Sequence, residues 1–417
     1  MPESAYSFYV GIDWATAVHQ VAVLDPERRL IAQRSVAHTG EALAEFADWL
    51  TALANGAPER VAVAIEVPRG AVVETLLERG FPVFALNPKQ LDRFRDRHTV
   101  AGAKDDRRDA FVLADALRTD RPAFRRVHPQ DPLIVQLREL SRVEEDLLQE
   151  FTRLSNRLRE QLLRFYPQPL ALCPAADEPW LWAVLALAST PAAAQRLTRA
   201  KVNKLLRAHH IRRFVADALL TQLQTPALHV APGTAEAASV HIALLVPRLR
   251  LLRDQRADCA RRIEDLLTRL EEDPDVVGQP VKHRDVAILR SLPGVGRTVA
   301  ATMLAEGGRA LAARDYHVLR AQAGIAPVTQ QSGKRALVLM RLGCNRRLRN
   351  AVYHWGRVGI QYDPRARAHY LQLRQRGHRH GRALRGVIDR LLAMLMAMLR
   401  AGTLYDPQRR QVGAAPV

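Results

Sequence analysis

One apolar stripe of unusual length constrains the fold of this 417-residue chain more than any other feature. Between Leu133 and Phe165, apolar residues recur at alternating spacings of three and four. This spacing places them on one face of a long helix. A second stripe runs from Ile242 to Leu270, and Arg256 interrupts it. The two stripes predict a coiled-coil arm, formed within one chain or between chains, or alternatively two helices of an ordinary bundle.

The residues before the first stripe have a different pattern, with short apolar runs that are typical of strands. Residues 7–40 contain three such runs in succession and predict an antiparallel meander. An amphipathic segment at 41–54 and a buried run at 60–66 follow, and then a further helix and strand. We therefore expect residues 1–125 to form an α/β domain with a mixed sheet, in the order of an RNase H-like (RuvC-like) fold.

Strand patterns become scarce after about residue 125. We expect a helical coiled-coil or insertion region at 126–282. We assign no site to its Ala- and Pro-rich centre. A mostly α-helical C-terminal domain is expected at 283–405, followed by a tail at 406–417.

The charge of the chain points to a polyanionic partner. The net charge is +19, and 18 Lys and Arg face only three Asp between Lys334 and Arg410, so +15 of it lies in this stretch. Such a concentration attracts nucleic acids over long range. The alternative is a solvated surface in an arginine-rich protein, but a general bias of that kind usually spreads along the whole chain.

Other features exclude several classes of protein. Cys173, Cys259 and Cys344 are far apart and form no CxxC pair, which argues against a zinc site or a disulfide framework. A reducing, cytoplasmic (bacterial) setting is expected. The N-terminus has no signal-peptide pattern, and the apolar run at 387–402 is too short and too charged to span a bilayer. We expect no membrane association.

Four acidic residues predict a metal site. Asp13 ends the first strand, and Glu66 ends a later buried strand. Asp106 and Asp109 stand three residues apart at the start of a helix, so they share a helix face. Carboxylates at the end of a sheet bind Mg²⁺, often as two ions that act on a phosphodiester. The alternative is that each acid caps a turn or a helix.

Two more acids compete with this set. Asp105 immediately precedes Asp106, and Asp115 lies further along the same predicted helix. The sequence alone leaves open whether Asp105 replaces Asp106 as a metal ligand.

The segment "ILRSLPGVGRTVAATMLAE" predicts a helix, a tight turn and a second helix, similar to a helix-hairpin-helix. Gly294 and Gly296 in the turn would let backbone N–H groups approach a DNA phosphate without obstruction by side chains. A plain helix–helix turn is the alternative.

A polar loop is expected at "GIAPVTQQSGKRALVL", with Ser332 beside Gly333, Lys334 and Arg335. Read locally, Ser332 is either an ordinary turn residue or a nucleophile. A serine hydroxyl needs a base or a metal to become a nucleophile, and this segment supplies cations only. The two cations are candidates for contacting a phosphate.

These motifs together resemble the DEDD transposases of the insertion-sequence IS110 family, also called bridge-RNA-guided recombinases. "AKDDRRDA" looks like the family's D-x-x-D signature. "LRSLPGVGRTVAATMLAE", "AQAGIAPVTQQSGK" and "LGCNRRLRNAV" look like its C-terminal transposase domain. The resemblance covers about residues 7–120 and 283–400, whereas the middle is similar only in being helical.

The resemblance implies that Ser332 is the DNA nucleophile and forms a covalent phosphoserine intermediate. It implies that Asp13, Glu66, Asp106 and Asp109 form the catalytic Mg²⁺ site, and that the two halves come from different subunits. The partners would be donor DNA, target DNA and a guide (bridge) RNA. The two apolar stripes suggest dimerisation and recombination of two duplexes suggests a tetramer, so a homodimer that assembles to a tetramer is expected. The candidate nucleic-acid contacts are Lys334, Arg335, Gly294, Gly296, Arg346, Arg347, Arg349, Arg376, Arg379 and Arg382.

Two other functions remain open at this stage. One is a metal-dependent RuvC-like nuclease, acting on Holliday junctions or other DNA, that uses water as its nucleophile and Ser332 only as a structural residue. The other is a nucleic-acid-binding scaffold without catalysis, which the complete carboxylate set argues against.

Overall fold

The computed structural model describes residues 6–96, 105–129, 131–272, 281–333 and 335–408. The chain divides into two compact units, Met1–Asp131 and Pro132–Val417. The predicted regions 126–282 and 283–405 both lie largely in the second unit, where they share a hydrophobic core. Most of the predicted tail, 409–417, lies outside the described residues.

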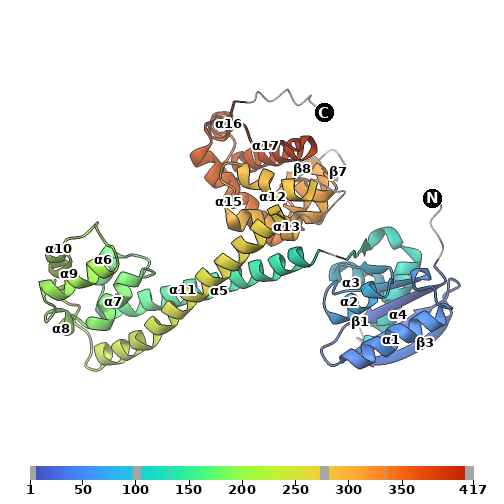
Figure 1. The fold of residues 1–417 in the computed structure, drawn as a ribbon, viewed down its shortest axis with the longest axis horizontal. Helices are drawn as coiled ribbons and strands as arrows, with labels where there is room; N and C mark the ends of the chain where they lie inside the picture. Colours follow the sequence, from blue (N-terminus) through green and yellow to red (C-terminus); the bar gives the residue numbers. More distant parts are fainter. Residues whose placement is uncertain (1–5, 97–104, 130, 273–280, 334, 409–417) are drawn as a thin grey trace. The chain divides into compact units, whose positions relative to one another are not determined.

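The first unit is built on a mixed sheet with the strand order β3-β2-β1-β4-β5-β6 (Figure 1). The first three strands form the predicted antiparallel meander. Strand β4 lies parallel to β1, and β5 lies parallel to β4. The strands are β1 (Phe8–Asp13), β2 (Val18–Leu24), β3 (Leu30–Ala37), β4 (Val61–Ile65), β5 (Val83–Ala85) and β6 (Arg125–Arg126).

Helices cover both faces of this sheet because the central strands are apolar on both sides. Alternate residues of β1 and β4, such as Val10 and Val63, share a core with helices α1 (Gly40–Leu53) and α2 (Ala71–Glu78). On the other face, Ala62 and Ala64 share a core with α3 (Pro88–Asp96) and α4 (Asp106–Thr119). Short 3-10 turns occur at Pro58–Arg60 and Arg121–Ala123.

The two long apolar stripes form the two long helices of the second unit, α5 (Pro132–Phe165) and α11 (Thr234–Glu272). They pack side by side and antiparallel (Figure 1). The start of α5 shares a core with the end of α11, through Leu137 and Ile263, and the far end of α5 shares another with the start of α11, through Leu158 and Leu245. The stripes therefore pack against each other within one chain.

Arg256, the polar residue in the second stripe, is accommodated by an aromatic ring. Its guanidinium carbon lies 5.2 Å from the ring centroid of Phe151 on α5. The attraction between the cation and the aromatic face offsets part of the cost of placing a charge where two helices pack. The methylene groups of an arginine side chain can also lie against apolar surface.

Short helices enclose one end of the long pair, around the buried Trp180 and Trp182. They are α6 (Gln168–Leu172), α7 (Pro179–Leu187), α8 (Pro191–Ala194), α9 (Arg199–Ala208) and α10 (Ala216–Leu223). At the other end a helical assembly surrounds the buried Trp355. It consists of α12 (Val281–Ser291), α13 (Arg297–Ala312), α14 (Tyr316–Gln322), α15 (Arg346–Tyr362), α16 (Pro364–Gln375) and α17 (His380–Ala401).

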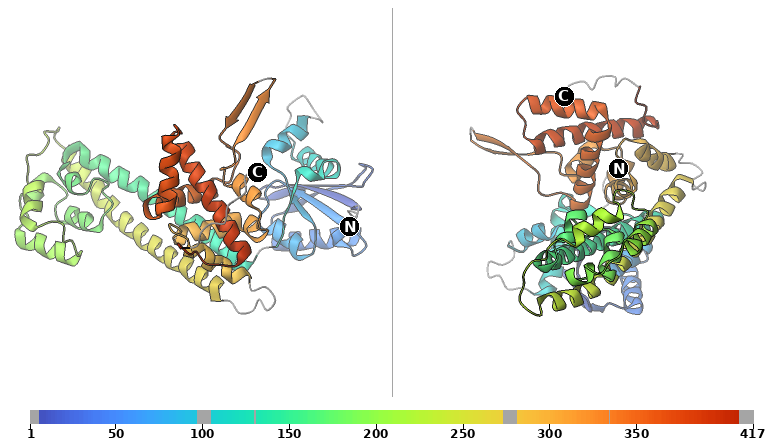
Figure 2. Two further views of the ribbon diagram at one scale, coloured as in Figure 1. Left: turned by 90° about the horizontal axis from the view of Figure 1, so that it is seen from above. Right: turned by 90° about the vertical axis from the view of Figure 1, so that its left-hand side faces the viewer.

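The predicted loop around Ser332 is instead a β-hairpin of β7 (Val328–Ser332) and β8 (Arg335–Leu339), so this prediction was wrong in its local structure. The hairpin stands out from the helices of its unit (Figure 2). Gly333 makes the tight connection possible because its φ of 57° is a conformation that other residues rarely adopt.

None of the helices that the structure describes carries an apolar stretch of the length needed to cross a bilayer.

Candidate active site and nucleic-acid interface

The alternation of side chains along β1 and β4 directs two candidate acids toward the same face of the sheet. Ile12 pairs with Ile65 in a parallel register, and both pack with α1 and α2. Asp13 follows Ile12, and Glu66 follows Ile65. Because successive side chains of a strand alternate between the two faces of the sheet, both acids belong to the opposite face, where α4 packs. Neighbouring parallel strands thus bring one acid each to the same edge of the sheet.

Helix α4 reaches this face by packing directly on the backbone of β1. A Cβ atom at Gly11 would lie 1.9 Å from the carbonyl oxygen of Ala110 and 2.6 Å from the backbone nitrogen of Ala114. Glycine is therefore required at this close approach of helix to strand. Gly11 lies two residues before Asp13, and Ala110 immediately follows Asp109, so this contact brings the two acids close together.

Three of the four predicted acids converge in the first unit. Oxygen atoms of Asp13, Asp106 and Asp109 all lie within 4.8 Å of one another. Asp106 is exposed, Asp13 is half-buried, and Asp109 is 2% exposed. Glu66 is half-buried and lies outside this group of three, although it follows the neighbouring strand. Carboxylates this close repel one another unless a cation or a proton lies between them.

The two competing acids have structural partners instead. Asp105 is the N-cap of α4, and its side chain accepts a hydrogen bond from the backbone nitrogen of Arg107 at 3.1 Å. Asp115 accepts hydrogen bonds from Arg118 at 3.1 and 2.8 Å and forms an ion pair with Arg28 at 3.2 Å. These contacts favour Asp106 over Asp105 as a candidate ligand.

A histidine that the sequence analysis did not single out supports the turn after Asp13. His19 is 1% exposed, and its Nδ1 accepts a hydrogen bond from the backbone nitrogen of Ala15 at 3.2 Å. Its Nε2 lies 2.9 Å from Nδ1 of His38. A neutral His19 satisfies both contacts only if its proton is on Nε2, which donates to His38. Burial, and secondarily the nearby His38, hold the pKa of His19 below its ordinary value of 6.5.

This lowered pKa predicts that acid loosens the turn. The folded protein favours neutral His19, so its stabilisation is complete above pH 6.5 and is lost as the pH falls toward the lower folded-state pKa. We expect the hydrogen-exchange protection of peptides from residues 8–24 to fall between pH 7 and pH 5, by about tenfold per unit of pKa difference. A His19→Phe variant should lose this pH dependence, and an unchanged dependence would assign it to another group.

Ser332 ends β7 in the second unit and is exposed. It pairs across the hairpin with Arg335, and the same register pairs Gln330 with Leu337. Lys334 and the side chain of Arg335 lie outside the described residues, so their predicted phosphate contacts stay predictions. Leu337, Val338 and Leu342 on and after β8 are 56%, 65% and 78% exposed, so the hairpin also presents apolar side chains to its surroundings.

The predicted helix–turn–helix consists of α12, the turn and α13, but its two glycines differ. Gly294 has φ 83°, and a Cβ there would lie 3.1 Å from the backbone nitrogen of Gly359 and 3.3 Å from Trp355. The Trp355 indole also donates to the carbonyl oxygen of Pro293 at 3.0 Å. Packing against α15 therefore explains the glycine at 294, whereas Gly296 is exposed at the N-cap of α13.

The candidate arginines fall into two groups. Arg346, Arg376, Arg379 and Arg382 are exposed, and the last three lie where α16 ends and α17 begins. Arg347 instead donates to Glu145 on α5 at 2.5 Å. Arg349 is half-buried, and its Cδ lies 3.4 Å from where a Cβ at Gly324 would be. The exposed group is the stronger candidate for contacting nucleic acid.

Two models of known protein families match this chain and indicate its class. Residues 10–167 match the family model of a DEDD transposase, and residues 286–371 match the model described as "Transposase IS116/IS110/IS902 family". The first match contains the four candidate acids, and the second contains Ser332 and the glycine-containing turn. Both ends of the chain therefore resemble transposases, a class of enzymes that cut and rejoin DNA.

Individual relatives identify the family. The chain is 31% identical over 417 residues to the "Mini-circle putative transposase for IS117" of Streptomyces coelicolor, with 98% of each chain covered. It is 30% identical to the "Insertion element IS900 uncharacterized 42 kDa protein" of Mycobacterium paratuberculosis, over 97% of this chain and 98% of the relative. The chain belongs to the IS110 family of transposases.

A shorter match has higher identity. The chain is 50% identical over 230 residues to the "Putative transposase y4uE" of Sinorhizobium fredii. This match covers 55% of this chain and 62% of that relative.

Proposed function

We propose that this transposase is a site-specific DNA recombinase that cuts and rejoins strands through a covalent phosphoserine intermediate. The observation that carries the proposal is the convergence of Asp13, Asp106 and Asp109 within 4.8 Å, in a chain whose family is that of transposases. The strand order β3-β2-β1-β4-β5, with a meander followed by two parallel strands, also agrees with a RuvC-like nuclease domain.

The donor set suits a divalent cation. Asp13, Asp106 and Asp109 supply only oxygen ligands, which is the preference of Mg²⁺, and Glu66, which follows the neighbouring parallel strand, is proposed as a fourth ligand. When bound, such ions offset the charge of a phosphodiester and stabilise its attacking and leaving oxygens. The carboxylates themselves would hold the ions on a rigid strand and helix.

Ser332 is the proposed nucleophile. Its Oγ would form a bond to phosphorus as the bond from phosphorus to the departing DNA oxygen breaks, and a DNA hydroxyl would later reverse the exchange. Each step replaces one phosphodiester by another, so no ATP is required. The described hairpin residues include no His, Asp or Glu, so the hydroxyl proton has to pass to a group elsewhere in the active assembly.

We further propose guidance by a bridge RNA, which family membership and the positive charge of the C-terminal part support. RNA paired to donor and target DNA would supply sequence recognition, while Arg346, Arg376, Arg379 and Arg382 would contact backbones. Recombination of two duplexes suggests a dimer that assembles to a tetramer. Measuring the mass of the protein with and without RNA tests this, and a monomer under both conditions would count against it.

A trapping assay tests the chemistry. The full chain is incubated with its RNA, labelled donor and target DNA and Mg²⁺, and then denatured. We expect a covalent protein–DNA band that Ser332→Ala eliminates, because alanine has no hydroxyl to attack phosphorus. Thr329→Ala, on the same strand, is the matched control and should retain the band.

The second candidate function, a RuvC-like nuclease that uses water, makes the opposite prediction. It is favoured by the carboxylate cluster alone. Under it, DNA is cut without a covalent band, and Ser332→Ala cuts as well as the wild-type protein. That outcome would replace the recombinase proposal.

A further inference from the structure

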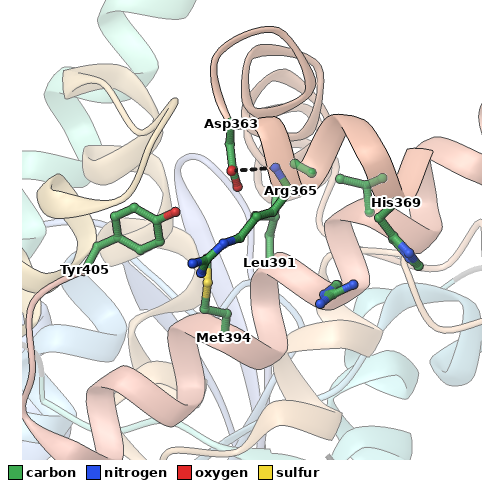
Figure 3. A pocket seen from close by; sticks show the side chains of 9 residues that line it. Asp363, Arg365, His369, Leu391, Met394 and Tyr405 are labelled. Atoms are coloured by element: carbon green, nitrogen blue, oxygen red, sulfur yellow. Dashed lines mark hydrogen bonds between the residues drawn. The ribbon is translucent and has the colours of Figure 1, made fainter. Parts of the chain in front are cut away.

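A cavity in the second unit is lined by none of the candidate residues described above. It has a volume of about 360 Å³ and lies between α16, α17 and the segment that follows α17 (Figure 3). This volume is at the lower end of the range of roughly 300–1,000 Å³ that is usual for small-molecule sites. The cavity therefore has room for one small, compact group.

The interior of the cavity is suited to a flat apolar group. Val387 and Leu391 of α17 form part of its wall and are 1% and 4% exposed. Met394 lies on the next turn of α17, and the ring of Tyr405 comes from the segment after the helix (Figure 3). A thioether and an aromatic ring are both good contacts for the face of a planar ring.

The rim of the cavity is suited to an anion. Arg365 on α16 and Arg390 on α17 both line it, and α17 is part of the strongly basic stretch. The carboxylate of Asp363 caps α16 by accepting a hydrogen bond from the backbone nitrogen of Arg365 at 3.0 Å. Two guanidinium groups beside an apolar interior suit a ligand with a flat ring at one end and a phosphate at the other.

Two polar groups in the wall are neutral at neutral pH and so can hydrogen-bond without adding charge. Burial, and then the carboxylate of Asp363, raise the pKa of Tyr405 above its ordinary value. Burial, and then Arg390, lower the pKa of His369. The Tyr405 hydroxyl and the His369 ring can each donate or accept a hydrogen bond at the edge of a heterocycle.

The aromatic wall is fixed in place on both sides. The backbone nitrogen of Tyr405 donates to Oγ of Ser291 at 2.9 Å, and Ser291 donates in turn to the carbonyl oxygen of Ile288 at 2.7 Å. Two residues further along, the carbonyl oxygen of Pro407 accepts a hydrogen bond from Arg365. The site is therefore preformed, which lowers the entropic cost of binding.

We propose that this cavity captures one unstacked nucleotide of a single-stranded nucleic acid, with its base against the wall that Met394, Arg365 and Tyr405 form (Figure 3) and its phosphate at Arg390. Single strands are recognised mainly through splayed-out bases that stack on aromatic side chains. The proposal rests on the proposed function only in that the partner is a nucleic acid. It does not depend on Ser332, so a failure of either proposal leaves the other standing.

Photocrosslinking of the full-length protein tests this assignment. Single-stranded RNA that contains 4-thiouridine, and single-stranded DNA that contains 4-thiothymidine, are each bound, irradiated and mapped by mass spectrometry. We expect the crosslinks to concentrate in the tryptic peptides LLAMLMAMLR and AGTLYDPQR, which carry Met394 and Tyr405. Crosslinking of RNA, of DNA or of both identifies the strand that supplies the nucleotide.

Two variants with a matched control decide the outcome. Met394→Trp fills the cavity and Arg390→Gln removes the phosphate contact, so each should lower the crosslink yield by about tenfold. Arg367→Gln removes another exposed charge, on α16 and outside the cavity, and should leave the yield unchanged. Circular dichroism verifies that each variant folds. Equal yields in all variants, or crosslinks spread over other arginine-rich peptides, would overturn the proposal.

Discussion

Replacing Gly11 with alanine is expected to separate α4 from β1 and to abolish the carboxylate cluster. The added Cβ would lie 1.9 Å from the carbonyl oxygen of Ala110 and 2.6 Å from the backbone nitrogen of Ala114. Both atoms belong to the helix backbone, so no rotation of a side chain can relieve the overlap. The helix has to move, and overpacking of this kind typically costs about 1–3 kcal/mol and occasionally more.

The measurement is hydrogen exchange on the full chain, read from peptides of β1 and α4. Gly11→Ala should lose protection in both elements and should lose any protection that Mg²⁺ adds to the wild-type protein. Gly40→Ala is the control in the same unit, because a Cβ there meets nothing within 4 Å. Wild-type protection in Gly11→Ala would show that the helix can be displaced without loss, contrary to this packing argument.

The second large effect is expected for Asp13→Asn, and it should appear as a lost response to the metal. The stability of each protein without a divalent cation is the baseline of the measurement. With Mg²⁺, the wild-type protein should gain stability by preferential binding of the ion to the folded state, and the variant should gain little. Strand exchange should fall by about a hundredfold or more, the upper end of losses from disturbed metal sites.

Asp105→Asn is the matched control for this experiment. It removes the charge of an acid next to Asp106 but keeps the helix cap, because asparagine caps as well as aspartate does. Calorimetry at several Mg²⁺ concentrations should therefore give a wild-type response for this variant. If both variants lose the Mg²⁺ response equally, the ion is bound by the general negative charge of the helix start, and the three-acid site is not its ligand set.

Much of the architecture could be predicted because it depends on apolar residues that recur at short, regular spacings along the chain. The antiparallel meander and the two long helices follow from apolar residues at periods of two and of three to four. The spacing of Asp106 and Asp109 likewise places both on one helix face without reference to the rest of the chain. The hairpin at Ser332 was missed because the glycine and polar residues at its tip are equally typical of an irregular loop.

The sequence by itself determined which residues could serve chemistry: four acids at element ends, one serine among cations, and a strongly basic C-terminal stretch. Only the tertiary structure decided which of them meet. Asp105 and Asp106 are chemically alike, yet the first caps α4 and the second joins Asp13. Gly294 and Gly296 look equivalent, yet only Gly294 packs against α15. The reason is that a contact between residues distant in sequence depends on how whole elements pack, and local periodicity carries no information about their partners.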